Sequence, residues 1–282
     1  MSNLFPIGLS MCDKKPLDEK GFAELYENGI EFAELSEGYA DEYALYDARV
    51  IKSAAQKAGV SLWSLHLPFY PFEIVDPSSL GREIRNYTVS LFTEIIKRWS
   101  DIGIDKFIIH PSGEPIDDSV RAERLKYSAQ SLSLIAENAA RQGSVIAVEN
   151  LPRTCLGRNS EEIRFLISAN DKIRVCFDTN HLLNEKIPDF IKCIGNKIIT
   201  THISDYDFVN ERHWLPGEGD IDWQELLNAL KAVGYNGPWL YELGLNAPAS
   251  IDRRTLTYKD FYNNAITVFS GERPASIGKR TV

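Results

Sequence analysis

The sequence predicts a single α/β domain with a (β/α)₈ barrel fold. Eight short apolar segments rich in β-branched residues alternate with eight segments of helical periodicity, and no linker-like stretch interrupts this alternation. The chain has 282 residues, which suits one such barrel. A doubly wound open sheet is the rival fold, but the count of eight and the lack of a GxGxxG turn favour the barrel.

The expected strands are short apolar runs, as in parallel sheets that are buried on both faces. The clearest is a β-branched run at 197–203, which ends in polar residues. The full set comprises residues 5–11, 30–35, 61–67, 106–110, 144–149, 173–178, 197–203 and 238–242.

The expected helices lie between these strands and after the last one. They cover residues 17–28, 41–58, 81–102, 119–142, 160–169, 187–195, 222–233 and 257–269. Many of them end at a glycine directly before the next strand, which is a common C-cap. These glycines are Gly29, Gly59, Gly103, Gly143 and Gly234.

The domain is expected to span residues 1–270, followed by a polar, basic and loose tail at 271–282. Apolar residues make up 44% of the chain, which is enough for a large core. The four cysteines form no CxxC pair and fit a reducing compartment. The apolar run at 4–11 is too short for a signal peptide or a membrane span. We therefore expect a cytoplasmic protein without a membrane partner.

The polar residues at the strand ends are the strongest functional signal. All five histidines of the chain lie at a strand end or in the loop that follows, together with several carboxylates. The set is His66, His110, Glu149, Asp178, His181, His202, Glu211, His213 and Glu242. In a barrel these positions converge on the C-terminal mouth, where active sites are built.

Such a cluster would carry a large desolvation and repulsion cost without a cation. A divalent metal removes this cost, and mixed carboxylate and imidazole ligands suit Zn, Mn, Fe or Co better than Ca. The sequence therefore predicts a metal site at the barrel mouth.

Three weaker signals each leave two interpretations open. Glu34, at the end of the second strand, could bind a ligand or orient a neighbouring histidine. Arg153 and Arg212 lie on mouth loops and could hold a hydroxyl or phosphate group, or be solvated. The aromatic run at 68–72 could form a rim against a sugar ring or pack under a loop.

These residues resemble the xylose-isomerase-like TIM barrels over nearly the whole chain. That family comprises sugar isomerases and epimerases, inosose-processing enzymes and apurinic-site nucleases of the endonuclease IV type. The motifs that carry the resemblance are Ser-Leu-His66, Ile-Ile-His110-Pro, Val-Glu149-Asn, Phe-Asp178-Thr-Asn-His181, Thr-His202-Ile-Ser-Asp and Leu-Pro-Gly-Glu-Gly-Asp-Ile-Asp-Trp223.

For a ketose 3-epimerase, the resemblance implies one metal ion held by Glu149, Asp178, His202 and Glu242. It also implies that the two glutamates exchange a proton of the sugar from opposite faces and that His181 contacts the substrate. The sequence departs from this pattern at Cys155, where the epimerases carry a second glutamate. That change puts the usual substrate clamp in doubt.

For an endonuclease, the resemblance implies three zinc ions, with His66, His110, Glu211 and His213 as the remaining ligands. Glu211 stands where aspartate is usual. The net charge of −9 counts against binding of DNA, which draws much of its affinity from neutralised phosphates.

Our first expectation is therefore a sugar or polyol isomerase or epimerase that depends on Zn, Mn, Mg or Co and works through an enediolate. Its catalytic residues would be Glu149, Glu242 and His181, and its substrate residues His66, Glu34, Arg153 and Arg212. The expected partner is a small sugar rather than nucleic acid, and a homo-oligomer is left open. The alternatives are a multi-zinc phosphodiester hydrolase and a metal-bearing binding protein that has lost catalysis.

Overall fold

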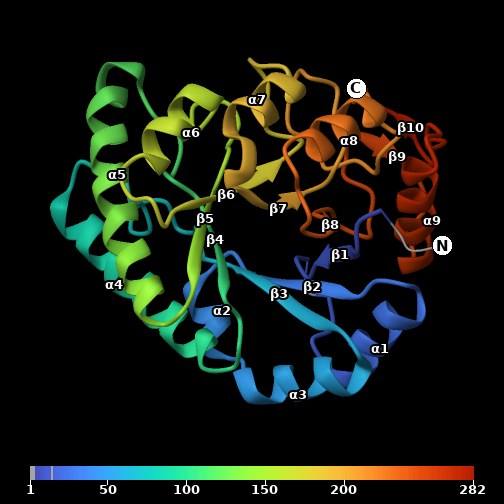
Figure 1. Ribbon diagram of the computed structural model, residues 1–282, viewed down its shortest axis with the longest axis horizontal. Coiled ribbons are helices and arrows are strands. Elements are labelled where there is room, and N and C mark those ends of the chain that lie inside the picture. The colour runs from blue at the N-terminus through green and yellow to red at the C-terminus, as the bar shows by residue number, and fades with distance from the viewer. Residues whose placement is uncertain (1–3, 14) are drawn as a thin grey trace.

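The computed structural model describes residues 4–13 and 15–282, and its main sheet is the expected barrel (Figure 1). Adjacent strands are parallel and follow the order β7-β6-β5-β4-β3-β2-β1-β8. A parallel bridge between Ile203 and Tyr241 joins the two ends of this sheet. The strands are β1 Ile7–Ser10, β2 Phe32–Ser36, β3 Ser61–His66, β4 Lys106–Ile109, β5 Val145–Glu149, β6 Arg174–Asp178, β7 Ile198–His202 and β8 Trp239–Tyr241.

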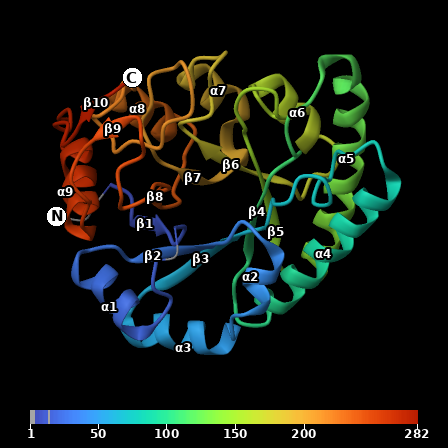
Figure 2. The ribbon, with the colours of Figure 1, turned by 180° about the vertical axis from the view of Figure 1, so that it is seen from behind.

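The helices surround the strands, as Figures 1 and 2 show from opposite sides. They are α1 Glu19–Glu27, α2 Ala40–Ala44, α3 Ala48–Ala58, α4 Arg82–Ser100, α5 Asp118–Arg141, α6 Ser160–Ile167, α7 Ile187–Ile194, α8 Trp223–Ala232 and α9 Tyr258–Phe269, with a 3₁₀ turn at Gly195–Lys197.

One predicted helix, at 41–58, is wrong as a single element, because it is divided into α2 and α3. The division falls before Asp47, whose carboxylate accepts a hydrogen bond from the amide of Arg49 at 2.9 Å and so caps a new helix. At the other end of α3, Gly59 adopts φ +83°, the left-handed conformation expected of a C-cap glycine.

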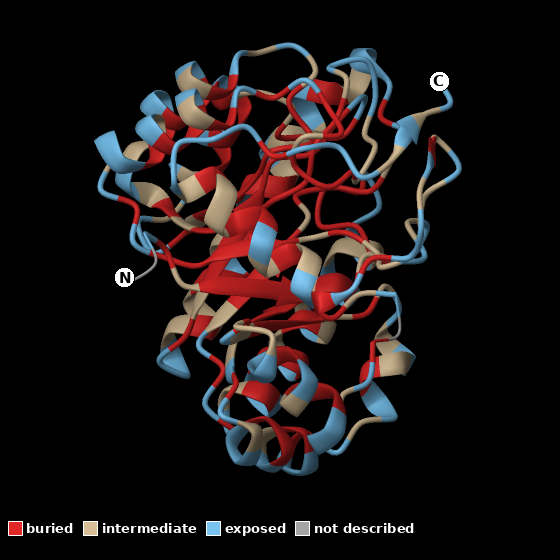
Figure 3. Ribbon diagram, turned by 90° about the vertical axis from the view of Figure 1, so that its right-hand side faces the viewer, coloured by how far each residue is buried: buried red, intermediate tan, exposed pale blue. Residues whose placement is uncertain are grey.

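The core has a large outer part and a small inner part. The outer part packs the strands against the helices, and Figure 3 shows the buried residues gathered along the sheet and the inner helix faces. The inner part lies within the barrel and consists of Ile108, Ala147 and Cys176, with Ile199 against it. This filling makes the barrel a packed support for its mouth.

The tail at 271–282 is not loose, so that expectation is wrong. Its residues Lys279–Arg280 form β10, which pairs antiparallel with β9 at Ile251–Asp252. The amide of Gly278 donates to Glu218 Oε1 at 3.1 Å, and Arg280 forms an ion pair with Asp220. The tail therefore holds the turn at 218–220, although the boundary at residue 270 stays a prediction.

Among the described residues, no helix has both the length and the apolar character needed to cross a membrane. The cytoplasmic location itself stays a prediction.

Candidate metal centre and active site

A cavity of about 770 Å³ opens at the C-terminal mouth of the barrel. The strand ends deliver the predicted polar residues to its floor, because parallel strands in a barrel all end on the same side. Those that line it are His66, His110, Glu149, His181, Glu211, His213 and Glu242. Asp178 and His202 lie beside them and are fully buried. The expected convergence at one mouth is confirmed.

The central group contains Glu149, Asp178, His202 and Glu242, with one ligand atom of each within 4.8 Å of the others. His202 Nδ1 lies 3.0 Å from Glu149 Oε1 and 3.1 Å from Glu242 Oε2. Asp178 Oδ2 is buried and has no hydrogen-bond partner in the described structure. A buried carboxylate oxygen without a partner is costly, so this atom fits a cation ligand.

The pKa values in this group express the same repulsion. Burial, together with the charges of Glu149 and Glu242, raises the pKa of Asp178 well above its usual range. Burial also opposes ionisation of Glu149, but its contacts with His202, His110 and His66 hold its pKa well below the ordinary value. Three carboxylates around one imidazole thus leave excess negative charge, which a divalent cation would balance.

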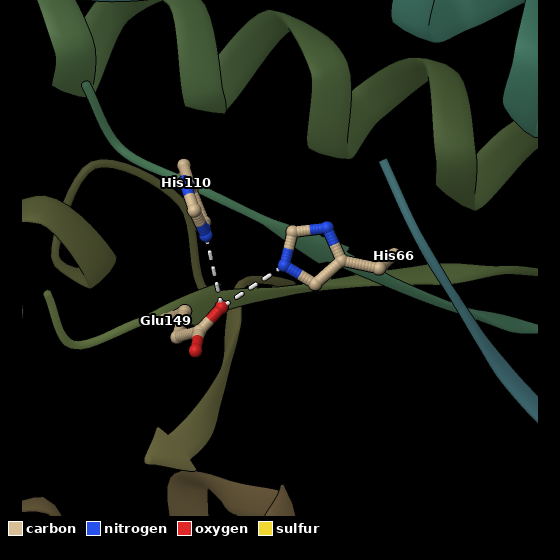
Figure 4. Close-up of side chains that lie close together, drawn as sticks. All are labelled: His66, His110 and Glu149. Atoms are coloured by element: carbon tan, nitrogen blue, oxygen red, sulfur yellow. Dashed lines mark hydrogen bonds and ion pairs between the residues drawn. The ribbon is translucent and has the colours of Figure 1, made fainter. Parts of the chain in front are cut away.

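A second group joins His66 and His110 to the same Glu149, as Figure 4 shows. Glu149 Oε2 lies 3.1 Å from His66 Nε2 and 3.3 Å from His110 Nε2. His66 Nδ1 donates to the carbonyl of Leu67 at 2.8 Å, which directs Nε2 toward the carboxylate. Glu149 therefore connects two potential ligand groups.

A third group consists of His181, Glu211 and His213, and its His181 Nδ1 lies 3.6 Å from Glu149 Oε1. His213 Nε2 lies 3.1 Å from Glu211 Oε1, and His181 Nε2 lies 3.9 Å from the same atom. His181 Nδ1 donates to the carbonyl of Asn150, and His213 Nδ1 donates to that of Glu242. Both histidines thus present Nε2 to Glu211, and all nine predicted ligands fall within the three groups.

The loop that carries Glu211 and His213 is organised by Asp205, to which we assigned no role from the sequence. Its carboxylate accepts hydrogen bonds from the amides of Gly217 and Ile221 and from the Trp223 indole. A Cβ on Gly219 would lie 2.1 Å from Asp205 Oδ1, so only glycine fits there. The Gly-Glu-Gly-Asp segment is therefore the partner of Asp205, and together they set the position of this loop.

Glu34 does not line the cavity, so its expected substrate-binding role is not supported. Its carboxylate accepts from His202 Nε2 at 3.0 Å and from the Ser64 hydroxyl at 2.7 Å, and all three residues are buried. These contacts leave His202 Nδ1 facing the central group. Of the two interpretations, the structure favours the one in which Glu34 orients a histidine.

Replacing Glu34 with alanine should weaken metal binding by roughly 10- to 100-fold, because His202 loses the acceptor that fixes its ring. Glu34→Gln should have a smaller effect, since its amide oxygen can still accept the hydrogen bond. Titration of the metal against a competing chelator measures both. Wild-type affinity in the alanine variant would contradict an orienting role.

Both predicted arginines line the cavity, but both are already paired. Arg153 Nη2 lies 2.6 Å from Glu114 Oε1, and its Nη1 also contacts Glu211. Arg212 forms an ion pair of 2.7 Å with Asp207. Arg153 is also exposed and Arg212 half-buried, so both interpretations stay open, but neither guanidinium is an unpaired cation.

Glu114 is a site residue that the sequence interpretation missed. It follows β4 by a few residues, and its Oε2 lies 3.4 Å from the Sγ of Cys155. A carboxylate from the neighbouring loop thus lies beside the position where the resemblance implies a glutamate. The signal available in the sequence was its position: Glu114 lies in the loop after β4, four residues beyond the predicted ligand His110.

This chain matches a known protein family over most of its length. A family model described as a xylose isomerase-like TIM barrel matches residues 22–256. D-psicose 3-epimerase from Ruminiclostridium cellulolyticum is 21% identical over 252 residues, which cover 84% of this chain and 82% of that protein. A probable endonuclease 4 from Acholeplasma laidlawii is 25% identical over 186 residues, and the match covers 59% of this chain and only 61% of that protein.

Among solved structures, a D-tagatose 3-epimerase-like protein matches with a TM-score of 0.77. The match covers 95% of this chain and 99% of that one, at 22% sequence identity. At such low identity this likeness supports the fold alone.

Proposed function

Because this chain belongs to the xylose isomerase-like TIM barrel family, we propose that it is a divalent-metal-dependent sugar or polyol isomerase or epimerase. The observation that carries the proposal is the central group, in which two glutamates flank the unpartnered Asp178 Oδ2 at the floor of the cavity. The similarity to D-psicose 3-epimerase over most of the chain adds support.

Glu149, Asp178, His202 and Glu242 would hold the metal. When bound, a divalent ion supplies Lewis acidity toward a carbonyl and an adjacent hydroxyl of the substrate. Glu34 would keep the His202 ring in position, and Ser64 in turn holds Glu34.

The two glutamates would move the proton. Burial disfavours the charged form of Glu242, but His202 lowers its pKa to about 2, so it is a carboxylate at neutral pH. One glutamate removes the proton from the carbon next to the carbonyl and produces an enediolate. The other, after taking a proton from solvent, would donate it to the opposite face of the enediolate and complete an epimerisation, and the first would then release its proton to solvent.

His181 would orient a substrate oxygen. Burial lowers its pKa, so the ring is neutral at pH 7, and its Nδ1 proton is held by the Asn150 carbonyl. The free Nε2 is therefore an acceptor for a substrate hydroxyl.

A multi-metal phosphodiester hydrolase is the second candidate, because the two outer ligand groups go beyond what a single ion needs. The charges at the mouth weigh against it. Arg153 and Arg212 are neutralised by Glu114, Glu211 and Asp207, and the chain carries a net charge of −9. A DNA backbone would find little free positive charge here.

Incubation with ketoses and inososes in deuterated water, beside an abasic-site duplex at low salt, separates the candidates. We expect deuterium to enter a sugar and the duplex to stay intact. Glu211→Gln and His213→Gln should reduce this exchange much less than changes in the central group do. The hydrolase would instead be established if the wild type cleaves the duplex without deuterium entering any sugar, and if this cleavage is lost in both variants. Tight metal binding with neither reaction would favour a binding protein.

A further inference from the structure

The outer part of the cavity contains aromatic rings that the proposed proton transfer does not use. We propose that this outer part binds a second sugar residue, so that the substrate is a glycosylated ketose or polyol rather than a free monosaccharide. The inference rests on the proposed function for the reacting sugar, but the outer subsite is argued from separate residues.

The rings form a continuous series that leads outward from the metal ligands. Phe69 stacks on His110 with ring centroids 4.6 Å apart, and Tyr70 follows at 4.5 Å from Phe69. Phe72 lies 4.7 Å from Tyr70, and Tyr39 stacks on Tyr70 with ring centroids 5.5 Å apart. The series therefore joins the expected catalytic floor to the rim.

The outermost rings are accessible although they are large and hydrophobic. Tyr70 is 37% exposed and Tyr39 is 47% exposed. Glycine backbone packs closely against two rings of the series: a Cβ on Gly38 would lie 3.2 Å from the Tyr70 ring, and one on Gly113 would lie 3.0 Å from Phe72 Cβ. Exposed aromatic surface on such a constrained support is typical of a binding site.

The wall near Tyr70 is polar and consists of the Glu114–Arg153 pair. Tyr70, Glu114 and Arg153 line the same cavity, and the ion pair between Glu114 Oε1 and Arg153 Nη2 measures 2.6 Å. An aromatic face beside a carboxylate and a guanidinium suits a sugar, which has an apolar ring face and hydroxyls at its edge. A purely apolar ring would leave these charged groups without new partners.

The size of the cavity agrees with a ligand of two rings. Its volume of about 770 Å³ lies in the range of sites that enclose drug-sized ligands. A monosaccharide placed at Glu149 and Glu242 would fill only the inner part and leave Tyr70 and Phe72 in water.

Isomaltulose is a suitable probe, because it is D-fructose with a glucosyl group on its terminal oxygen and leaves the carbonyl region free. We expect the metal-loaded protein to bind isomaltulose about tenfold more tightly than D-fructose in titration calorimetry, and to exchange its carbon-bound proton more efficiently. Tyr70→Ala should remove this preference and leave D-fructose unchanged within about twofold. The matched control is Tyr87→Ala, which changes an exposed tyrosine of α4 that does not line the cavity.

Equal binding of both sugars, with no effect of Tyr70→Ala, would overturn the second-sugar subsite and leave the isomerase proposal intact. Conversely, tight Tyr70-dependent binding of isomaltulose without proton exchange in any sugar would retain the subsite and refute the isomerase. A third probe, D-fructose with a benzyl ether on its terminal oxygen, tests the nature of the ring. If it binds as well as isomaltulose, and Glu114→Ala alters neither, the ligand is an apolar ring and the sugar assignment is wrong.

Discussion

Replacing Glu149 or Glu242 with glutamine should abolish exchange of the substrate's carbon-bound proton with solvent, a loss of about 10³-fold or more. Both side chains reach the floor of the cavity, and both lie within 3.1 Å of His202 Nδ1. Glutamine keeps the shape but cannot accept the proton. Deuterium incorporation measured by NMR on a reactive sugar gives the rate directly.

A matched control is Glu94→Gln, which changes an exposed glutamate of α4 that does not line the cavity. It should leave the rate unchanged. Because Glu149 and Glu242 are also expected ligands, the metal content of each variant must be measured alongside. If a variant exchanges the proton at the wild-type rate, that glutamate is not the base.

Removing the metal should lower the unfolding temperature. At a metal concentration a thousand times its dissociation constant, the linked stabilisation is about 4 kcal/mol. For a domain of this size that corresponds to a shift of roughly 10 °C. The physical reason is the central group, where burial and two neighbouring carboxylates raise the pKa of Asp178. Thermal unfolding before and after chelation measures the shift.

The control for this experiment is Asp178→Asn, which removes the negative charge and can replace the unpartnered Oδ2 by an amide nitrogen while keeping the side-chain volume. Its unfolding temperature should respond much less to chelation than that of the wild type. An unchanged wild-type curve, with metal loss verified, is the result that speaks against a stabilising ion in this group.

The barrel and the general location of its site could be predicted from the sequence because both follow from local patterns. Buried parallel strands need short apolar runs, and the helices that connect them end at capping glycines. Once the strands are known to be parallel, the polar residues at their ends must meet at one mouth. The positions of His66, His110, Glu149 and Asp178 therefore follow from chain order alone.

Contacts between distant side chains could not be predicted in this way. Glu34 and His202 are 168 positions apart, and their hydrogen bond depends on the register of the strands and on both side-chain rotamers. The tail was misjudged for a related reason: its composition is polar, but its backbone pairs with β9 and its Arg280 meets Asp220.

The sequence by itself thus determined the fold, the mouth and the identity of the nine potential ligands. Only the tertiary structure decided how these ligands divide into groups, that Glu149 belongs to two of them, and that Arg153 is paired with Glu114 and Glu211. The reason is one of range. Hydrophobic periodicity is set by neighbours along the chain, whereas charge pairing is set within a few ångströms by side chains that folding brings from different strands and loops.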